Sequence, residues 1–223
     1  MRTIIAPPLR SPARVRESSR PPLTVGLVQT RWHPDADEHA AVLADGIASA
    51  AAAGAEVVFL PELTLQRYPA DTRPAADPTV LAEPQDSGPT FALVAAAAAR
   101  NGVMVHASLY EQADGTDGLG FNTAILVGTD ARLVAHTRKL HIPVTAGYFE
   151  DAYFRPGPAT DAYPVTTLAA PSAARIGLPT CTSGSPKSPG PSTSPARKCW
   201  PTRLRSARSP TTPTSTPSHC GSR

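Results

Sequence analysis

The sequence has few cysteines and no long apolar run, and both absences narrow the class of protein. Its three cysteines, Cys181, Cys199 and Cys220, are an odd number and lack the Cys-x-x-Cys or Cys/His spacing of a zinc site. No apolar stretch is long enough to cross a membrane, and residues 1–22 lack the apolar centre of a secretory signal. We therefore expect a cytoplasmic protein that holds no metal and does not insert into membranes.

Acidic residues are absent from residues 182–223 and nearly absent from residues 1–22. The net charge of the chain is +3, but these two ends contribute +7 and +4, so residues 23–181 carry −8. A basic chain would suggest a nucleic-acid partner, yet here the positive charge lies wholly in the two ends. The acidic central region argues against a nucleic-acid groove.

The two ends also lack apolar periodicity. Residues 182–223 contain 25 Ser, Pro or Thr among 42 positions, which leaves too little apolar surface to offset the entropy of ordering them. We expect a disordered leader over residues 1–22, a single folded domain over residues 23–181, and a disordered tail over residues 182–223.

Within the central region, short apolar runs alternate with helical segments. The first helix is predicted between Asp35 or Asp37 as its cap and Gly54 as its end, and the second between Thr90 as its cap and Asn101–Gly102. Apolar runs predict buried strands, and the last two of them read as a hairpin. These strands are expected at residues 23–30, 56–63, 103–111, 122–128 and 132–140. The alternation predicts a layered α/β domain.

Four reactive side chains follow the ends of predicted strands, namely Glu62, Glu111, Lys139 and Cys181. Ligands of open α/β sheets bind beyond the carboxyl ends of strands, so these side chains form a candidate site. A cysteine nucleophile needs a base and a donor for the oxyanion, and Glu62 and Lys139 can supply them. Taken singly, each of three residues has a more common non-catalytic explanation: Glu62 as a solvated loop acid, Lys139 as a surface charge near a strand end, and Cys181 as a small buried hydrophobe.

Four motifs in this region follow one another in a specific order. They are VVFLPEL at 57–63, GFNTAILVGTDARLVAHTRKLHIP at 120–143, GYFEDAYFRPG at 147–157 and RIGLPTC at 175–181. Together they resemble the signatures of the nitrilase, or carbon–nitrogen hydrolase, superfamily over about residues 23–181. The sequence around RKLHIP is most similar to the branch of N-carbamoylputrescine amidase and β-ureidopropionase.

The resemblance implies a fold and a mechanism. The fold would be the N-terminal part of a four-layer α-β-β-α sandwich, in which Glu62 is the general base, Lys139 stabilises the oxyanion and Cys181 is the nucleophile. Glu150 would support the lysine and the substrate. Pocket-lining residues would be His141, Tyr148 and Phe149. The resemblance implies no cofactor, a small amide or N-carbamoyl substrate that is hydrolysed through a cysteine thioester, and a homo-oligomer.

After Cys181 the sequence departs from this family, whose members continue with Trp-Asp and a helix. Codons for Thr182–Pro191 can be chosen so that a reading one base earlier encodes Asp-Glu-Trp-Phe-Pro-Glu-Val-Ala-Arg-Ala, a helical segment of the family's kind. We therefore interpret residues 182–223 as a frameshifted end that truncates the domain, weakens catalysis and compromises the oligomer. The alternative is a non-catalytic fragment whose basic tail binds an acidic partner.

Overall fold

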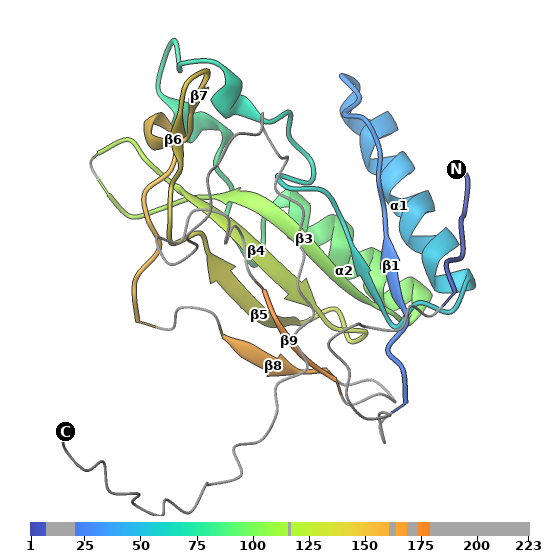
Figure 1. The fold of residues 1–223 in the computed structure, drawn as a ribbon. Coiled ribbons are helices and arrows are strands. Elements are labelled where there is room, and N and C mark those ends of the chain that lie inside the picture. Colours follow the sequence, from blue (N-terminus) through green and yellow to red (C-terminus); the bar gives the residue numbers. More distant parts are fainter. Residues whose placement is uncertain (8–20, 116, 161–163, 169–173, 179–223) are drawn as a thin grey trace, which may run out of the picture.

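A five-stranded sheet organises the chain (Figure 1). The computed structural model describes residues 1–7, 21–115, 117–160, 164–168 and 174–178. The strands lie side by side in chain order, with β1, β2 and β3 parallel and β4 and β5 antiparallel to their neighbours. They are β1 (Val25–Leu27), β2 (Val57–Phe59), β3 (Met104–Glu111), β4 (Phe121–Val127) and β5 (Leu133–Arg138). The predicted strands and the predicted hairpin are therefore present, although β1 and β2 are shorter than expected.

The two predicted helices are α1 (Ala36–Ala52) and α2 (Pro89–Asn101). Asp35 caps α1, because its carboxylate accepts a 2.7 Å hydrogen bond from the backbone N–H of Glu38. Beyond the end of α1, Gly54 has φ +91°, and α2 ends at Gly102 with φ +63°; both are left-handed conformations that favour glycine. These three signals were correctly assigned from the sequence.

The predicted cap of α2 was wrong. Gly88 occupies the cap position, and Thr90 lies within the first turn. The carboxylate of Glu83 accepts hydrogen bonds from the Thr90 backbone N–H at 2.8 Å and from its hydroxyl at 2.5 Å. A buried acid from an earlier loop therefore satisfies a backbone N–H in the first turn of the helix, where negative charge is stabilising.

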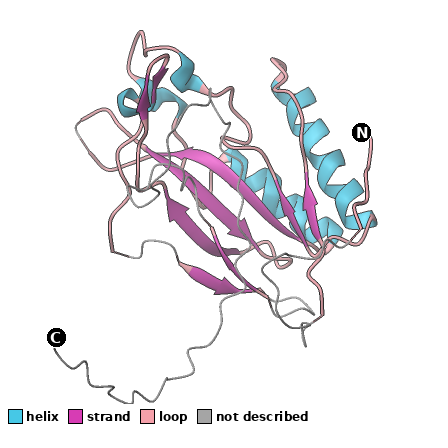
Figure 2. Cartoon of the chain, viewed as in Figure 1, coloured by secondary structure: helices cyan, strands magenta, loops and turns pink. Residues whose placement is uncertain are grey.

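Both faces of the sheet are covered, which explains why every position of β3 is buried. Side chains alternate between the faces of a strand, so Val105, Ala107 and Leu109 pack against α1 and α2. Met104, Ala124 and Leu126 face the other way, where a separate strand pair lies over them. That pair is β8 (Val165–Thr167) and β9 (Arg175–Gly177), and it packs through Leu168, Ile176 and Leu178. The order helix, sheet, strand pair is the mixed α/β layering that was expected (Figure 2).

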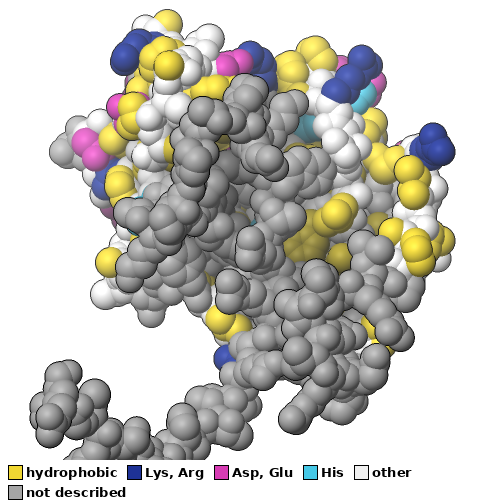
Figure 3. Space-filling view, viewed as in Figure 1, with side chains coloured by type: hydrophobic (Ala, Val, Ile, Leu, Met, Phe, Trp, Pro, Cys, Tyr) yellow, Lys and Arg dark blue, Asp and Glu magenta, His cyan; other side chains and the backbone are white. Residues whose placement is uncertain are grey.

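Short elements gather at one end of the sheet. They are the 3₁₀ helices η1 (Pro69–Asp71), η2 (Pro78–Leu81) and η3 (Glu150–Ala152), and the hairpin of β6 (Val144–Thr145) with β7 (Tyr148–Phe149). Many of the charged side chains drawn in the space-filling view lie toward this end (Figure 3).

Parts of the expected domain division can be compared with the structure. Residues 1–7 of the leader form neither helix nor strand and are exposed. Residues 8–20, the predicted nucleophile Cys181 and the tail 182–223 lie outside the described residues. Among the described helices, none has the length and apolarity that a membrane span requires.

Candidate active site

The strand register brings distant polar residues to one edge of the sheet. Glu111 at the end of β3 pairs with Phe121 at the start of β4, and Thr123 of β4 pairs with Arg138 at the end of β5. The carboxyl ends of β2, β3 and β5 therefore meet at the same edge. Glu62 follows β2 there and Lys139 follows β5, so the predicted base and the predicted lysine come together.

Lys139 is the centre of this group. Its side chain is 0% exposed, and its Nζ lies 2.6 Å from Oε2 of Glu150 and 3.5 Å from Oε1 of Glu62. The backbone N–H of Lys139 donates to the carbonyl of Asn122 at 2.8 Å, which holds the residue to the start of β4. A buried ammonium is costly unless carboxylates compensate it, and here two do.

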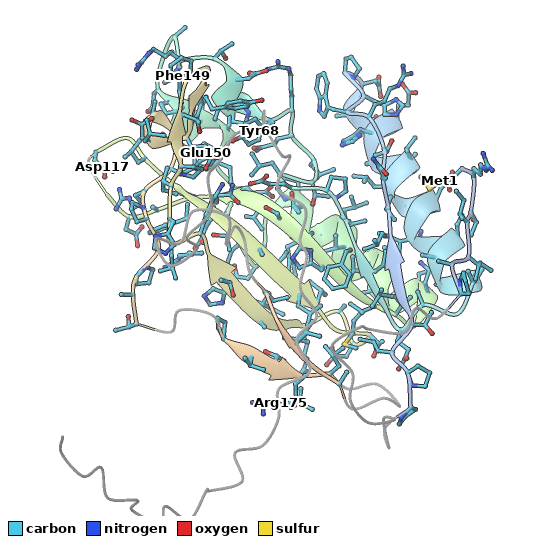
Figure 4. All side chains as sticks on the ribbon, in the orientation of Figure 1. Met1, Tyr68, Asp117, Phe149, Glu150 and Arg175 are labelled. Carbon is cyan, nitrogen blue, oxygen red and sulfur yellow. The ribbon has the colours of Figure 1, made fainter. Side chains whose placement is uncertain are left out.

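Glu150 is held from both of its oxygens. Oε2 accepts from Lys139, and Oε1 accepts a 2.5 Å hydrogen bond from the hydroxyl of Tyr68. Figure 4 shows Tyr68 and Glu150 near each other at the upper end of the sheet. Tyr68 precedes Glu150 by 82 residues, and no local spacing in the sequence indicates their contact.

Glu62 is the most accessible member of the group, with 25% of its side chain exposed. Its Oε1 accepts a 2.8 Å hydrogen bond from Nδ2 of Asn122, a buried residue near the start of β4. Asn122 was not predicted from the sequence, although a polar amide near the start of a mostly apolar strand was a usable signal. Asn122 thus helps to orient Glu62, while part of the Glu62 side chain remains exposed.

The residue after Glu62 has an unusual backbone. Leu63 is buried and has φ +48°, one of the two non-glycine residues with positive φ among those described. Such a conformation costs about 1–3 kcal/mol and persists only where the surroundings impose it. The strained position directly adjoins the candidate base.

Glu111 is not part of this group, contrary to the expectation from strand ends. Its carboxylate pairs with the guanidinium of Arg138, including a 2.9 Å bond from Nε, and accepts a 2.5 Å bond from Thr123. Because side chains alternate along a strand, Arg138 and Lys139 point to opposite faces of the sheet. Glu111 therefore forms a separate ion pair.

The predicted pocket residues lie in different settings. Tyr148 is exposed on β7, and its ring centroid is 6.3 Å from that of Tyr68, so it lies near Glu150. Phe149 carries the guanidinium of Arg73 over its ring at 4.4 Å. His141 is itself exposed in the link between β5 and β6, and it lies outside the hydrogen-bonded group.

The predicted nucleophile, Cys181, follows the described residue Leu178 by three positions. Leu178 packs on the face of the sheet that carries Met104 and Ala124. Within the described ranges, no group of three His, Cys, Asp or Glu side chains is arranged to hold a metal ion.

Known proteins share this sequence pattern. The family model for carbon-nitrogen hydrolase matches residues 24–184. The citrullinase of Francisella tularensis subsp. tularensis is 30% identical over 138 residues, which are 61% of this chain and 46% of that protein.

Solved structures share the fold. A carbon-nitrogen hydrolase from Helicobacter pylori G27 aligns with a TM-score of 0.62 at 23% identity, over 71% of this chain and 52% of the other. An amidase from Nesterenkonia sp. aligns with a TM-score of 0.56 at 23% identity, over 71% of this chain and 55% of the other. The chain spans about half the length of these relatives. Its match to the family model covers most of its own length, and the chain belongs to the carbon-nitrogen hydrolase family.

Proposed function

We propose that the protein hydrolyses the C–N bond of a linear N-carbamoyl amine or amide through a thioester on Cys181. The observation that carries the proposal is the buried Lys139 between Glu62 and Glu150, with Glu62 partly open. A cation held this way is a preorganised partner for negative charge that develops on a substrate oxygen.

In the first half of the proposed reaction, Glu62 takes the proton of the Cys181 thiol. The sulfur then attacks the carbonyl carbon, and the ammonium of Lys139 stabilises the negative charge on the carbonyl oxygen. Glu62 returns the proton to the leaving nitrogen as the C–N bond breaks. The products of this half are an amine or ammonia and a thioester.

In the second half, Glu62 takes a proton from water, which attacks the thioester carbon. The C–S bond breaks, and the proton returns to the sulfur. Glu150 stays bound to Lys139 and Tyr68 throughout, which keeps the ammonium in place. The single base therefore serves twice, and the chain finishes in its starting protonation state.

The similarity to a citrullinase supports the N-carbamoyl substrate class. Citrulline, after which that relative is named, is itself an N-carbamoyl amine with a linear carbon chain. The branch resemblance of the RKLHIP segment points to the same chemistry. We therefore place N-carbamoylputrescine, N-carbamoyl-β-alanine and citrulline ahead of simple aliphatic amides as substrates.

The test is hydrolysis of these three compounds and of an aliphatic amide by a purified chain whose reading frame is restored after Cys181, with release of ammonia as the readout. We expect turnover of at least one N-carbamoyl compound, lost in Glu62→Gln and in Cys181→Ala. Turnover that persists in Cys181→Ala would reject the thioester. Turnover of the aliphatic amide alone would reject the substrate class.

We also propose that residues 182–223 arise from a shifted reading frame. The support is the helical segment that the neighbouring frame can encode directly after Cys181. Sequencing the encoding DNA across Cys181 tests this, and assays compare the 223-residue chain with a frame-restored one. We expect the restored chain to be the more active and to form the larger oligomer; equal activity and size would contradict the proposal.

Two further expectations rest on the sequence. Cysteine usage still predicts a cytoplasmic location, which fractionation of the producing cells would check. The alternative of a non-catalytic fragment that binds an acidic partner is not favoured by membership of a hydrolase family.

A further inference from the structure

We propose that Thr64 is a positioning residue that closes a ring of hydrogen bonds around Glu62. The ring passes from Thr64 through Ser108 and Asn122 to the carboxylate of Glu62, and returns along the backbone to Thr64. Its catalytic meaning rests on the proposed function of Glu62 as the base. The ring itself rests on geometry alone.

The first half of the ring holds the backbone of the turn that carries Glu62. The N–H of Thr64 donates to the carbonyl of Ser108 at 2.8 Å, and the N–H of Ser108 donates back to Oγ1 of Thr64 at 3.0 Å. The hydroxyl of Thr64 also donates to the carbonyl of Pro61 at 2.9 Å. One buried hydroxyl thus ties both ends of the turn to the middle of β3.

The second half holds the carboxylate. The hydroxyl of Ser108 donates to Oδ1 of Asn122 at 3.3 Å, and Nδ2 of Asn122 donates to Oε1 of Glu62 at 2.8 Å. A flipped amide would set Oδ1 of Asn122 against the carboxylate of Glu62, which can only accept, so Glu62 selects the orientation in which Nδ2 faces it. The hydroxyl of Ser108 then donates to Oδ1 and holds the amide in that orientation.

A fourth hydrogen bond of Thr64 joins α1 to the same turn. His39 of α1 is buried, and its Nε2 donates to the carbonyl of Thr64 at 2.9 Å. Every polar atom of Thr64 is therefore engaged, directly beside the strained backbone of Leu63. Backbone strain persists only where neighbours over-determine it, and these four hydrogen bonds are the neighbours that do so.

Loss of the Thr64 hydroxyl should free the turn. Valine has nearly the shape of threonine, so Thr64→Val removes the two hydrogen bonds of the hydroxyl, to the Pro61 carbonyl and from the Ser108 N–H, and keeps the backbone bond from Thr64 to Ser108. The Leu63 backbone can then relax and shift Glu62. A misplacement of about 1 Å in a catalytic group costs about 10²-fold in rate.

The matched control is Thr137→Val in β5. Thr137 is also a buried threonine, and its hydroxyl has no hydrogen-bond partner among the described residues. The same change there removes an oxygen without breaking a bond. Thr64→Ser is the rescue variant, since it keeps the hydroxyl.

The first measurement is hydrogen exchange of the peptide spanning residues 61–66 in the full 223-residue chain. We expect exchange about tenfold faster or more in Thr64→Val, which corresponds to a loss of about 1.4 kcal/mol in local opening free energy. Thr64→Ser and Thr137→Val should match the parent. Equal exchange in Thr64→Val and Thr137→Val would overturn the ring.

The second measurement is steady-state kinetics in the more active of the two chain forms. We expect Thr64→Val to lower kcat about 10²-fold with KM nearly unchanged, and Thr64→Ser to restore most of it. An unchanged kcat in Thr64→Val, in a parent that depends on Glu62, would overturn the positioning role. Equal rates in the parent and Glu62→Gln would instead reject the proposed function, and the exchange result would still decide on the ring.

Discussion

Two ion-paired groups share the same edge of the sheet, and they differ in how their charges are matched. Arg138 and Glu111 form a one-to-one pair, with the Arg138 side chain 30% exposed and Glu111 also bound by Thr123. Lys139, the next residue, is 0% exposed and faces two carboxylates, Glu62 and Glu150. Two neighbouring cations on opposite faces of the sheet thus have different numbers of carboxylate partners.

The difference separates a structural pair from a reactive group. In the first, the planar guanidinium uses two nitrogens on one carboxylate, and that acid raises the pKa of Arg138 further above its already high value. In the second, one carboxylate anchors the ammonium while the other stays partly open. Two carboxylates exceed the one that a single buried cation needs for charge balance, and in the proposed mechanism the second carboxylate is the base while the cation is the oxyanion partner.

The largest expected effect is that of Lys139→Met. The substitution removes the oxyanion partner, so the more active chain form should lose about 10²–10³-fold in kcat for its N-carbamoyl substrate. It also leaves Glu150 buried beside Tyr68 without its cation, so stability should fall by several kcal/mol, about 3–5. Ammonia release and urea unfolding measure the two effects. Retained kcat would show that Lys139 belongs with the structural pair.

His106 lies on β3, the strand that ends in Glu111, and is a buried group without a charge partner among the described residues. Its ring lies 5.0 Å from that of Phe59, and burial lowers its pKa to about 4. The unfolded chain, with an ordinary histidine pKa of about 6.5, binds the proton first as the pH falls. The contribution of neutral His106 to the free energy of unfolding is therefore fully present above about pH 6.5 and is lost as the pH falls toward 4, by about 3 kcal/mol in all.

Urea unfolding at several pH values between 7 and 4 checks this, with His106→Leu as the comparison. The variant should lose the part of the pH dependence that His106 contributes. A pH slope identical in the parent and the variant would show that His106 does not remain neutral in the fold.

Arg138→Met should give the opposite division of effects from Lys139→Met. It removes two hydrogen bonds to the buried Glu111 and the stacking of Arg138 over Phe121 at 4.3 Å. We expect a loss of about 2 kcal/mol in the free energy of unfolding, since a buried acid is left under-satisfied. Turnover should stay near that of the parent at a temperature where the variant is folded. A kcat loss as large as that of Lys139→Met would erase the distinction between the two groups.

The smallest expected effect is that of Tyr68→Phe. It removes the hydroxyl that donates to Glu150 at 2.5 Å and keeps the ring that packs near Tyr148. Hydrogen bonds to charged groups contribute about 1.5–3 kcal/mol, so we expect the free energy of unfolding to fall by about 1.5 kcal/mol and kcat to fall roughly tenfold. Thermal unfolding and turnover measure both. An unaltered kcat would mean that Lys139 alone holds Glu150.

Much of the fold was readable because local signals agreed with tertiary packing. The apolar run 103–111 predicted a buried strand, and β3 is buried throughout because helices cover one face and β8 and β9 the other. Asp35 and Gly54 act as their residue types predict. Thr90 failed as a cap because Glu83, brought close by the loop, competes for the same role.

The site was only partly readable for the same reason. Glu62, Lys139 and Glu150 were found through motifs, and the structure places them together. Tyr68 and Asn122 were missed because their contacts span 82 and 60 residues and leave no local periodicity. Glu111 was grouped with the site because a strand-end rule ignores which face a side chain occupies.

The most direct test of the central claim, that Lys139 and not Arg138 serves a Cys181 thioester, is acid-quenched mass spectrometry of the peptide containing Cys181. The more active chain form, Lys139→Met and Arg138→Met are each mixed with the N-carbamoyl substrate and quenched during turnover. We predict an acyl group on Cys181 in the parent and in Arg138→Met, and its absence in Lys139→Met. Acylation of another residue, or equal acylation in Lys139→Met and the parent, would contradict the claim.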